Sequence, residues 1–460
     1  MRSKRLTQLK NIIAVSILSA FSGSAMAQNT NSGYFLDGYL YRHEMNPAFD
    51  NERNYVSMPA LGNLNLSLRG NIAVDDVFYN VNGRTTTFMN PLVSVSEVMG
   101  NLSDNNKLNL NVKEEILSAG FKAFGGYNTV GVSVRAFMGA NLPRDLFSLI
   151  KEGASNRTYD ISDVNAYTDS YAELAFGHSR DINDNLRVGA KVKFLLGLAN
   201  VDAQFKNVKL TLGEDSWNVM ADAMVESSIK GLAYQHEINE NTNHEYVSGA
   251  EIDGFGLNGF GLAFDLGAEY RLNDDWAFSA SVLDLGFVGW NNNMLATTNG
   301  LQEFSTDKYT FNVNDDAVNN FDDEFEKMKD DLSGLYELND EGDQGGRTKM
   351  IGATINLGAE YTLPVYNKLK FGLMNSTRIQ GRYSWTEFRL SANVAPVDVF
   401  SANVNMAAGT YGVSFGWLLN FHTTGFGLFV GMDHTFGSTA KQGVPMSGNA
   451  SMNLGINFPF

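Results

Sequence analysis

The sequence predicts an all-β fold, a transmembrane outer-membrane barrel of about 14 antiparallel strands. Three observations predict it: an exported amino terminus, a long series of segments with alternating apolar and polar residues, and an aromatic final residue. In the last segment Met452, Leu454, Ile456, Phe458 and Phe460 share one face of an extended ribbon, and Ser, Asn, Gly, Asn and Pro share the other. Such a ribbon is typical of a barrel strand that meets lipid with its apolar face and the lumen with its polar face.

Residues 1–27 are typical of a secretory signal peptide. Four basic residues precede a short apolar stretch over 12–21, and Ala25-Met26-Ala27 supplies small residues for cleavage between Ala27 and Gln28. An amino-terminal membrane anchor is the alternative, but a spanning helix needs about 20 apolar residues. Because no later segment is uninterruptedly apolar over such a length, we expect an exported chain without a transmembrane helix.

The composition narrows the classes of fold and partner. The chain of 460 residues has no cysteine, so no disulfide holds the exported protein together, and a lipid-anchored lipoprotein is excluded. A large core or a closed hydrogen-bonded sheet must stabilise it instead. Loss of residues 1–27 changes the formal net charge from −17 to −21. Nucleic acid is therefore not an expected partner, because phosphate binding needs clustered Lys and Arg.

Residues 28–60 are irregular, and the barrel is expected over 61–460. Apolar and polar residues alternate in the first part of that region, which predicts strands over 64–68, 117–123, 130–138, 172–176, 186–198, 208–212, 217–225, 260–272 and 276–282. Gly125-Gly126 lies between two of these runs and predicts a hairpin.

Three features interrupt the alternation. Short helices are expected over 91–100, where apolar residues share one face, and over 143–153, which has Pro near its start and Gly at its end. The polar residues 234–253 predict a surface loop. Asp284 shifts the alternation of its strand and predicts a β-bulge.

Residues 314–346 are the compositional outlier, an acidic segment expected as an external loop. Phe321, Phe325, Met328 and Leu332 have helical spacing, which predicts a short acidic helix inside this loop. The simpler interpretation is a solvated charged loop with no specific partner.

The last third is the most regular part of the chain. Its alternating runs predict strands over 353–363, 369–373, 388–394, 400–406, 411–421, 426–436 and 451–460. Most of the well-patterned runs reach the ~9–11 residues that a strand needs to cross a bilayer. Short turns alternate with long polar loops, as in outer-membrane barrels. A β-sandwich would have shorter strands, and a propeller or β-helix would have a fixed repeat period.

No motif nominates catalytic, cofactor-binding or metal-binding residues. Residues 412–416 match the G-x-S-x-G pattern of a nucleophile elbow, but Ser414 is expected in mid-strand with no helix after it. Residues 254–259 match a dinucleotide fingerprint, but a strand follows them where the motif needs a helix. His236 and His244 share one polar loop without the spacing of a metal-binding pair. We therefore expect no cofactor and no enzyme.

Four features carry a resemblance to a known family. These are Asn46-Pro47-Ala48 after the exported amino terminus, the Leu-Pro-Arg-Asp-Leu-Phe segment 142–147 between early strands, a strand number near fourteen, and a last strand that ends on Phe460. With these features the chain resembles the FadL-type outer-membrane barrel superfamily. Within it, the chain resembles the Bacteroidota branch of PorV-like proteins and related barrels of unknown function.

The resemblance implies roles for both ends of the chain. Residues 28–60 would plug the lumen, with Asn46, Pro47 and Ala48 as the plug motif. The last strand would be the signal that the barrel-assembly machinery reads, through Met452, Leu454, Ile456, Phe458 and Phe460. The expected surroundings are outer-membrane lipid.

The resemblance also implies one of two functions. The barrel binds or passes small hydrophobic molecules across the outer membrane, or it is a scaffold or accessory barrel for protein export or surface assembly. A channel predicts an open lumen or a lateral gap with an apolar pocket. A scaffold predicts a filled lumen and an exposed apolar patch on the external loops. An enzyme, which is not expected, would need convergent Ser, His and acidic side chains at the barrel rim.

Overall fold

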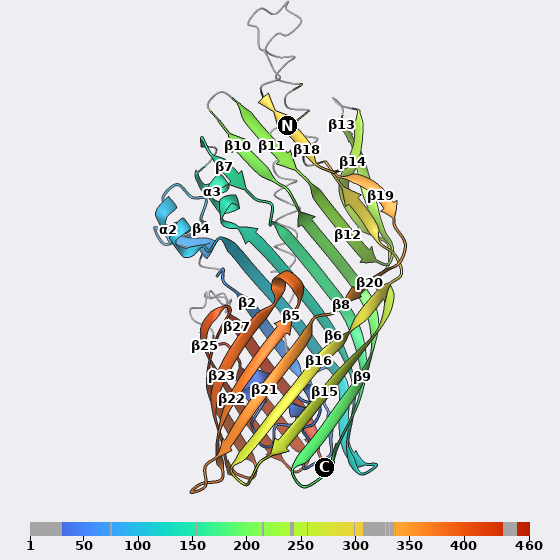
Figure 1. The fold of residues 1–460 in the computed structure, drawn as a ribbon, viewed down its shortest axis with the longest axis vertical. Coiled ribbons are helices and arrows are strands. Elements are labelled where there is room, and N and C mark those ends of the chain that lie inside the picture. The colour runs from blue at the N-terminus through green and yellow to red at the C-terminus, as the bar shows by residue number, and fades with distance from the viewer. Residues whose placement is uncertain are drawn as a thin grey trace, which may run out of the picture.

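The computed structural model describes most of the chain after residue 29 (Figure 1). The described residues are 30–73, 76–152, 155–213, 216–239, 243–254, 256–298, 300–306, 327, 331, 335, 337–435 and 449–460. The signal-peptide residues Ala27 and Gln28 lie outside them, and so do all four residues of the expected acidic helix.

Fourteen antiparallel strand positions close into a barrel within the described residues, as the sequence predicts. Ten positions are single strands: β5 (Asn105–Ala123), β6 (Gly126–Pro143), β8 (Asn165–Asp181), β9 (Leu186–Phe205), β22 (Leu369–Ile379), β23 (Trp385–Val397), β24 (Phe400–Gly409), β25 (Gly412–Thr423), β26 (Phe426–Met432) and β27 (Ala450–Pro459). The barrel closes because β27 and β5 both pair with the first strand position, β1 (Tyr55–Ser57) followed by β2 (Leu64–Gly70).

The other three positions are also built from consecutive segments. They are β12 (Ala223–Ile229) with β15 (Gly259–Arg271), β16 (Trp276–Trp290) with β17 (Met294–Thr297), and β19 (Asn339–Asp343) with β20 (Arg347–Met350) and β21 (Ala353–Thr362). Both β12 and β15 pair with β9, one above the other. The residues between them form a hairpin of β13 (Leu232–Asn239) and β14 (His244–Ile252), so the expected surface loop over 234–253 is wrong.

Burial along the strands is the reverse of that in a soluble protein. On β27 the side chains of Asn453 and Asn457 are 1% and 3% exposed, whereas Phe458 is 41% exposed. On β23 Arg389 is 2% exposed and its neighbour Phe388 is 58% exposed. The polar faces line the inside and the apolar faces cover the outside, which is the arrangement of a barrel in lipid. The predicted transmembrane β-barrel is confirmed.

Helices are few and short. α2 (Val95–Asn101) begins after Ser94, whose hydroxyl accepts a hydrogen bond from the Glu97 backbone N–H at 3.1 Å. This cap starts the helix later than the expected residue 91, as a Ser-x-x-Glu capping pattern favours. α3 (Arg144–Glu152) matches the expected helix over 143–153. Among the described residues, no helix is long and apolar enough to cross a membrane.

One side of the barrel is taller than the other (Figure 1). The strands β8, β9 and β12 extend upward, and a four-stranded sheet stands above them, formed by β7 (Thr158–Asp160), β10 (Lys209–Leu212), β11 (Trp217–Ala221) and β18 (Gln302–Ser305). The single strand expected over 217–225 is therefore two strands, β11 in this sheet and β12 in the barrel wall. A small lobe of α2, α3 and the hairpin β3 (Phe78–Val81) and β4 (Arg84–Thr87) lies beside them.

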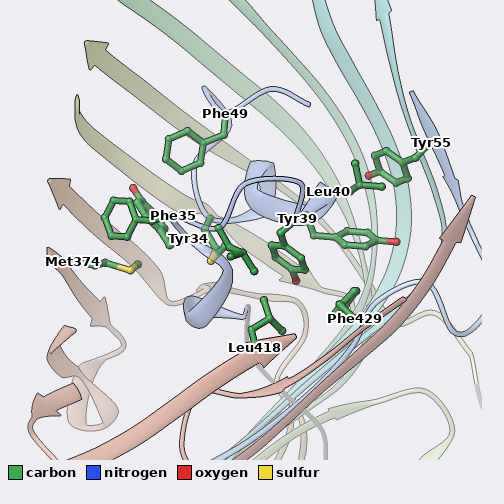
Figure 2. Packing of buried hydrophobic residues seen from close by; sticks show 12 residues of the cluster. Tyr34, Phe35, Tyr39, Leu40, Phe49, Tyr55, Met374, Leu418 and Phe429 are labelled. Atoms are coloured by element: carbon green, nitrogen blue, oxygen red, sulfur yellow. The ribbon is translucent and has the colours of Figure 1, made fainter. Parts of the chain in front are cut away.

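The amino-terminal segment lies inside the lower barrel, where it contributes most of an apolar core (Figure 2). It contains two short 3-10 helices, η1 (Asn31–Gly33) and η2 (Leu40–Glu44). Twelve buried residues form this lumenal core: Tyr34, Phe35, Leu36, Tyr39, Leu40, Tyr41, Met45, Phe49, Tyr55, Met374, Leu418 and Phe429. The main hydrophobic core of the molecule is thus in the lumen, because the outward faces of the strands are left for lipid.

Candidate functional site

Asp433 holds the start of the amino-terminal segment. Its carboxylate accepts hydrogen bonds from the backbone N–H groups of Asn31 and Ser32 at 2.8 and 2.6 Å, and from the Ser32 hydroxyl at 2.6 Å. Asp433 is only 3% exposed. Hydrogen bonds to a buried carboxylate are stronger than those between neutral groups, so this contact fixes where the segment enters the lumen.

The Asn46-Pro47-Ala48 motif lies against two wall strands. Asn46 is fully buried, and its side-chain amide donates to the backbone oxygens of Ala268 and Ala280 at 3.2 and 3.3 Å. A Cβ atom at Gly189 or Gly267 would collide with Pro47 or Asn46. Glycine at these two wall positions therefore lets the motif approach the backbone of β9 and β15.

Charged residues hold the middle of the segment. The Glu44 carboxylate forms a salt bridge with the Lys113 ammonium and accepts a hydrogen bond from Asn63 at 2.7 Å. Burial alone raises the pKa of Glu44, but the ammonium groups of Lys113 and Lys191 outweigh burial and lower its pKa to about 2. The neighbouring His43 ring lies 2.8 Å from the Tyr55 hydroxyl and 2.9 Å from Lys191 Nζ. Both ring nitrogens of His43 are thus engaged with the wall.

A bulge at Asp284 places a buried carboxylate on the inward face of β16. The register of β15 and β16 shifts between Phe264 and Leu266, and Asp284 has a φ of 59°, so the expected bulge is confirmed. Asp284 contacts Arg135 Nη1 at 3.0 Å and Lys193 Nζ at 2.6 Å.

Three further contacts complete this charge cluster, which we call the Asp284 cluster. Arg378 lies 3.7 Å from Asp284, Lys193 lies 2.7 Å from Asp265, and Arg135 lies 3.1 Å from Glu173. The cluster therefore balances three cations with three carboxylates, drawn from β6, β8, β9, β15, β16 and β22. The sequence predicted the bulge but not these partners.

The loop between β22 and β23 reaches across the upper lumen to β8. It carries η5 (Gly381–Tyr383), and the Tyr383 ring centroid lies 4.4 Å from that of Tyr167 on β8, across the barrel. Gln380 donates to the Tyr167 hydroxyl at 2.7 Å, and Arg382 pairs with Asp163 at 2.6 Å. We call residues 380–384 the η5 loop.

Below the η5 loop, a second set of lumen-facing wall positions is apolar, separate from the lumenal core around the plug. The patch joins the inward faces of β6, β8, β9, β15 and β16 to the η5 loop, and we call it the lumenal apolar patch. Its members are Phe137, Tyr167, Tyr171, Leu195, Ala263, Val288, Trp290 and Tyr383. The sequence could have revealed part of this patch. Leu195 lies two residues after Lys193 on the same strand, so alternation places both side chains on the inward face.

Three cavities lie among these layers. Their volumes are about 20, 30 and 10 Å³, which is room for one or two water molecules each. The first is lined by Met45 and Phe137 and by Arg135, Asp284 and Arg378 of the Asp284 cluster, among other residues. The second is lined by Glu44, Lys113 and Lys191 and by Glu173, Lys193 and Asp265, among others. None of these three is large enough for an organic molecule in this conformation.

The predicted residues of the last strand lie at the barrel seam. The side chains of Met452, Leu454 and Ile456 are less buried than the polar residues between them, and Phe460 is 69% exposed. The Phe460 backbone N–H donates to the Asn54 carbonyl at 2.9 Å, so the two ends of the barrel domain meet.

The histidines of the β13–β14 hairpin bind acidic side chains. His236 lies 3.0 Å from Asp340, and His244 lies 3.0 Å from Glu337. In the described part of the chain no three His, Cys, Asp or Glu side chains are grouped to hold a metal ion.

Comparison with known proteins gives one family and several distant structures. The chain is similar to the Ralstonia pickettii toluene transporter TbuX (8% identity, 95% of each chain, TM-score 0.40) and the Pseudomonas putida toluene transporter TodX (9% identity, 95% of this chain and 94% of that one, TM-score 0.37). It is also similar to a Pseudomonas aeruginosa FadL homologue (11% identity, 95% of this chain and 98% of that one, TM-score 0.38). No curated protein matches the chain. Residues 47–433 match the family described as "Family of unknown function (DUF5723)", and the chain belongs to this family.

Proposed function

We propose that the protein is an outer-membrane barrel that binds small hydrophobic molecules in its lumen and passes them across the membrane. The observation that carries this proposal is the lumenal apolar patch beneath the η5 loop. Pockets for hydrophobic ligands are lined by aromatic and aliphatic side chains with few polar groups. Phe137, Leu195 and Val288 supply buried apolar surface of this kind on the inward face of the barrel.

The outward apolar faces support the membrane location. Residues 1–27 would direct export and be cleaved between Ala27 and Gln28. Residues 28–60 would act as the plug, anchored by Asn46, Pro47 and Ala48. We also retain the PorV-like branch of the FadL-type barrels as the proposed subfamily, on the residues named for it above.

The plug and the η5 loop both lie in the lumen, but the contacts that hold them differ in strength. This difference indicates which of the two moves when the lumen opens. The plug shares a core of twelve buried residues, each worth about 1.5–3 kcal/mol when fully buried. The η5 loop is held by one ring contact, a few hydrogen bonds and an exposed ion pair. We propose that the η5 loop moves to admit a ligand while the plug stays in place.

Replacing Tyr383 with Ala tests this function. The substitution removes the ring contact with Tyr167, at a cost to the closed state of about 1–2 kcal/mol, so the open population should rise roughly 5- to 30-fold. We expect faster uptake of a small aromatic hydrocarbon, such as toluene, into liposomes that contain the variant. The matched control is Tyr366→Ala, in the β21–β22 turn at the opposite end of the barrel. If neither the wild type nor Tyr383→Ala takes up or binds the hydrocarbon, the proposal fails.

A scaffold for protein export or surface assembly is the second candidate. Two observations favour it: the water-sized cavities, and apolar side chains exposed on the α2–α3 lobe. On that lobe Leu92 is 71% exposed, Met89 is 48% exposed and Ile150 is 46% exposed. Absence of uptake in both the wild type and Tyr383→Ala would leave this candidate standing.

The carboxy-terminal assembly signal gives a separate prediction. Deleting Phe460 is expected to lower the amount of folded barrel in the outer membrane, because the insertion machinery would no longer find the terminal aromatic residue. The lumenal substitution Asn453→Ala on the same strand is the control and should reduce the amount less. Heat-modifiable gel mobility of outer-membrane fractions measures both. Equal amounts of folded protein from the two variants would show that Phe460 has no such role.

A further inference from the structure

Three chemically reactive side chains meet at the upper end of the shorter barrel side. Ser414 lies on β25, His434 follows β26, and Glu387 lies on β23. Ser414 Oγ is 2.7 Å from His434 Nδ1, and His434 Nε2 is 3.5 Å from Glu387 Oε2. A hydroxyl, an imidazole and a carboxylate from three separate parts of the chain thus lie next to one another in that spatial order.

The surroundings fix how the imidazole is oriented. Glu387 lies 2.6 Å from Arg389 Nη2 and 3.6 Å from Arg69 Nη1, so it is held as a carboxylate and can only accept hydrogen bonds. The His434 nitrogen that faces it, Nε2, makes no hydrogen bond at this separation among the described residues, but the nearby negative charge favours the tautomer with the hydrogen on Nε2. The other nitrogen, Nδ1, then accepts from the Ser414 hydroxyl, which is the arrangement a general base needs.

Two glycines of the G-x-S-x-G segment shape the site without a helix. Gly412 has a φ of +91° at the tight turn between β24 and β25, which places Ser414 two residues from the rim. A Cβ atom at Gly416 would lie 2.8 Å from the Asp433 carbonyl oxygen, so only glycine lets the segment with His434 pack this close. The absence of the strand-to-helix turn does not prevent the contact, because catalytic geometry is independent of fold.

The site opens into a cavity whose lining includes the positively charged side chain of Arg69. The cavity is lined by Arg69, Trp385, Tyr411, Ser414 and His434, among other residues, and has a volume of about 10 Å³. The Arg69 guanidinium is stacked on the Trp385 ring at 3.9 Å. A fixed guanidinium in the same cavity as a serine can stabilise the negative oxygen that forms when an ester carbonyl is attacked, provided that this oxygen forms within its reach.

We propose that Ser414 and His434 are catalytic residues of a hydrolase site for short-chain esters, with Glu387 as the positioning residue. The Ser414 oxygen forms a bond to the acyl carbon, and its proton moves to His434 Nδ1. The bond from the acyl carbon to the alcohol oxygen breaks, and the alcohol leaves with that proton. Water then attacks the acyl carbon and gives a proton to His434. The bond from the acyl carbon to the Ser414 oxygen breaks, the proton passes from His434 to that oxygen, and the carboxylic acid leaves.

Covalent labelling of the full-length barrel tests the proposal. The purified protein in detergent is treated with a small fluorophosphonate probe, and the modified residue is identified by mass spectrometry. We expect labelling at Ser414, loss of labelling in Ser414→Ala, and a labelling rate roughly 100-fold lower in His434→Gln. Ser391→Ala is the matched control, since Ser391 also faces the lumen but its hydroxyl is hydrogen-bonded only to Gly372 and Asn393 among the described residues, and this variant should label normally. Wild-type protein that labels no faster than Ser414→Ala overturns the proposal.

The positioning role of Glu387 has its own measurement. Glu387→Gln should slow hydrolysis of 4-nitrophenyl acetate about tenfold while heat-modifiable mobility stays normal, and Glu387→Asp should recover part of that rate. If Glu387 had only a structural role, Glu387→Gln would change the heat-modifiable gel mobility and not the rate of hydrolysis. Neither readout depends on passage through the lumen, so failure of the channel proposal and failure of this one are distinguishable. An unchanged rate of hydrolysis in Glu387→Gln would show that Glu387 does not position His434.

Discussion

A barrel that lacks residues 30–54 is expected to be an open, water-filled channel. The deletion removes eight of the twelve residues of the lumenal core, which leaves Tyr55, Met374, Leu418, Phe429 and the polar side chains of the lower inner face. Small barrels of about eight strands are filled by their own side chains, whereas barrels of 16 to 18 strands leave an aqueous channel. With fourteen strand positions the interior here is wide enough to need the plug.

Single-channel recording in planar bilayers measures this effect. The wild type should be closed, and the deletion variant, with residues 1–29 retained, should give a steady ohmic conductance. A variant without residues 232–252, the external β13–β14 hairpin, is a control of similar size and should remain closed. A folded deletion variant that stays closed would show that the η5 loop seals the lumen without the plug. Adding Tyr383→Ala to it would then be expected to open the channel.

The barrel strands could be predicted because lipid imposes a strict rule on them. Every outward side chain from the start to the end of a span meets hydrocarbon, so the period of two runs through β25 and β27 without a break. The β13–β14 hairpin shows where the rule ends. Both its faces are largely exposed, with Glu237 and Glu251 on its two strands, so no apolar period marked it as strand.

The lumenal contacts could not be predicted because they depend on which strands lie opposite each other. Asp284 could be identified in the sequence because it interrupts the alternation of its own strand. Its partners could not, because Arg135 is 149 positions away in sequence and Lys193 is 91 positions away. Closure of the barrel brings them together. The same holds for Ser414, whose motif was visible in the sequence while His434 and Glu387 carried no local signal.

Asp284→Ala is expected to be among the most destabilising single substitutions in the barrel. It leaves Arg135, Lys193 and Arg378 with two carboxylates instead of three inside a buried cluster. Removing one partner of a buried ion pair costs about 3–5 kcal/mol, because the remaining charge cannot be hydrated. The free energy of unfolding from urea titration in detergent micelles or lipid vesicles measures the loss. Asp181→Ala is the matched control: Asp181 pairs with Arg187 but is 67% exposed, so its loss should cost less than about 1 kcal/mol.

Two further variants separate charge from backbone strain. Alanine is strained at the φ of 59° that Asp284 adopts, whereas asparagine tolerates this region, so Asp284→Asn isolates the loss of charge. Arg378 has Asp284 as its one ion-pair partner among the described residues, so Asp284→Asn with Arg378→Met restores balance between two cations and two carboxylates. The double variant should therefore be more stable than Asp284→Asn alone. If it is less stable, Arg378 contributes through its hydrogen bonds to Thr354 and Gln380, and charge balance is not what the Asp284 cluster provides.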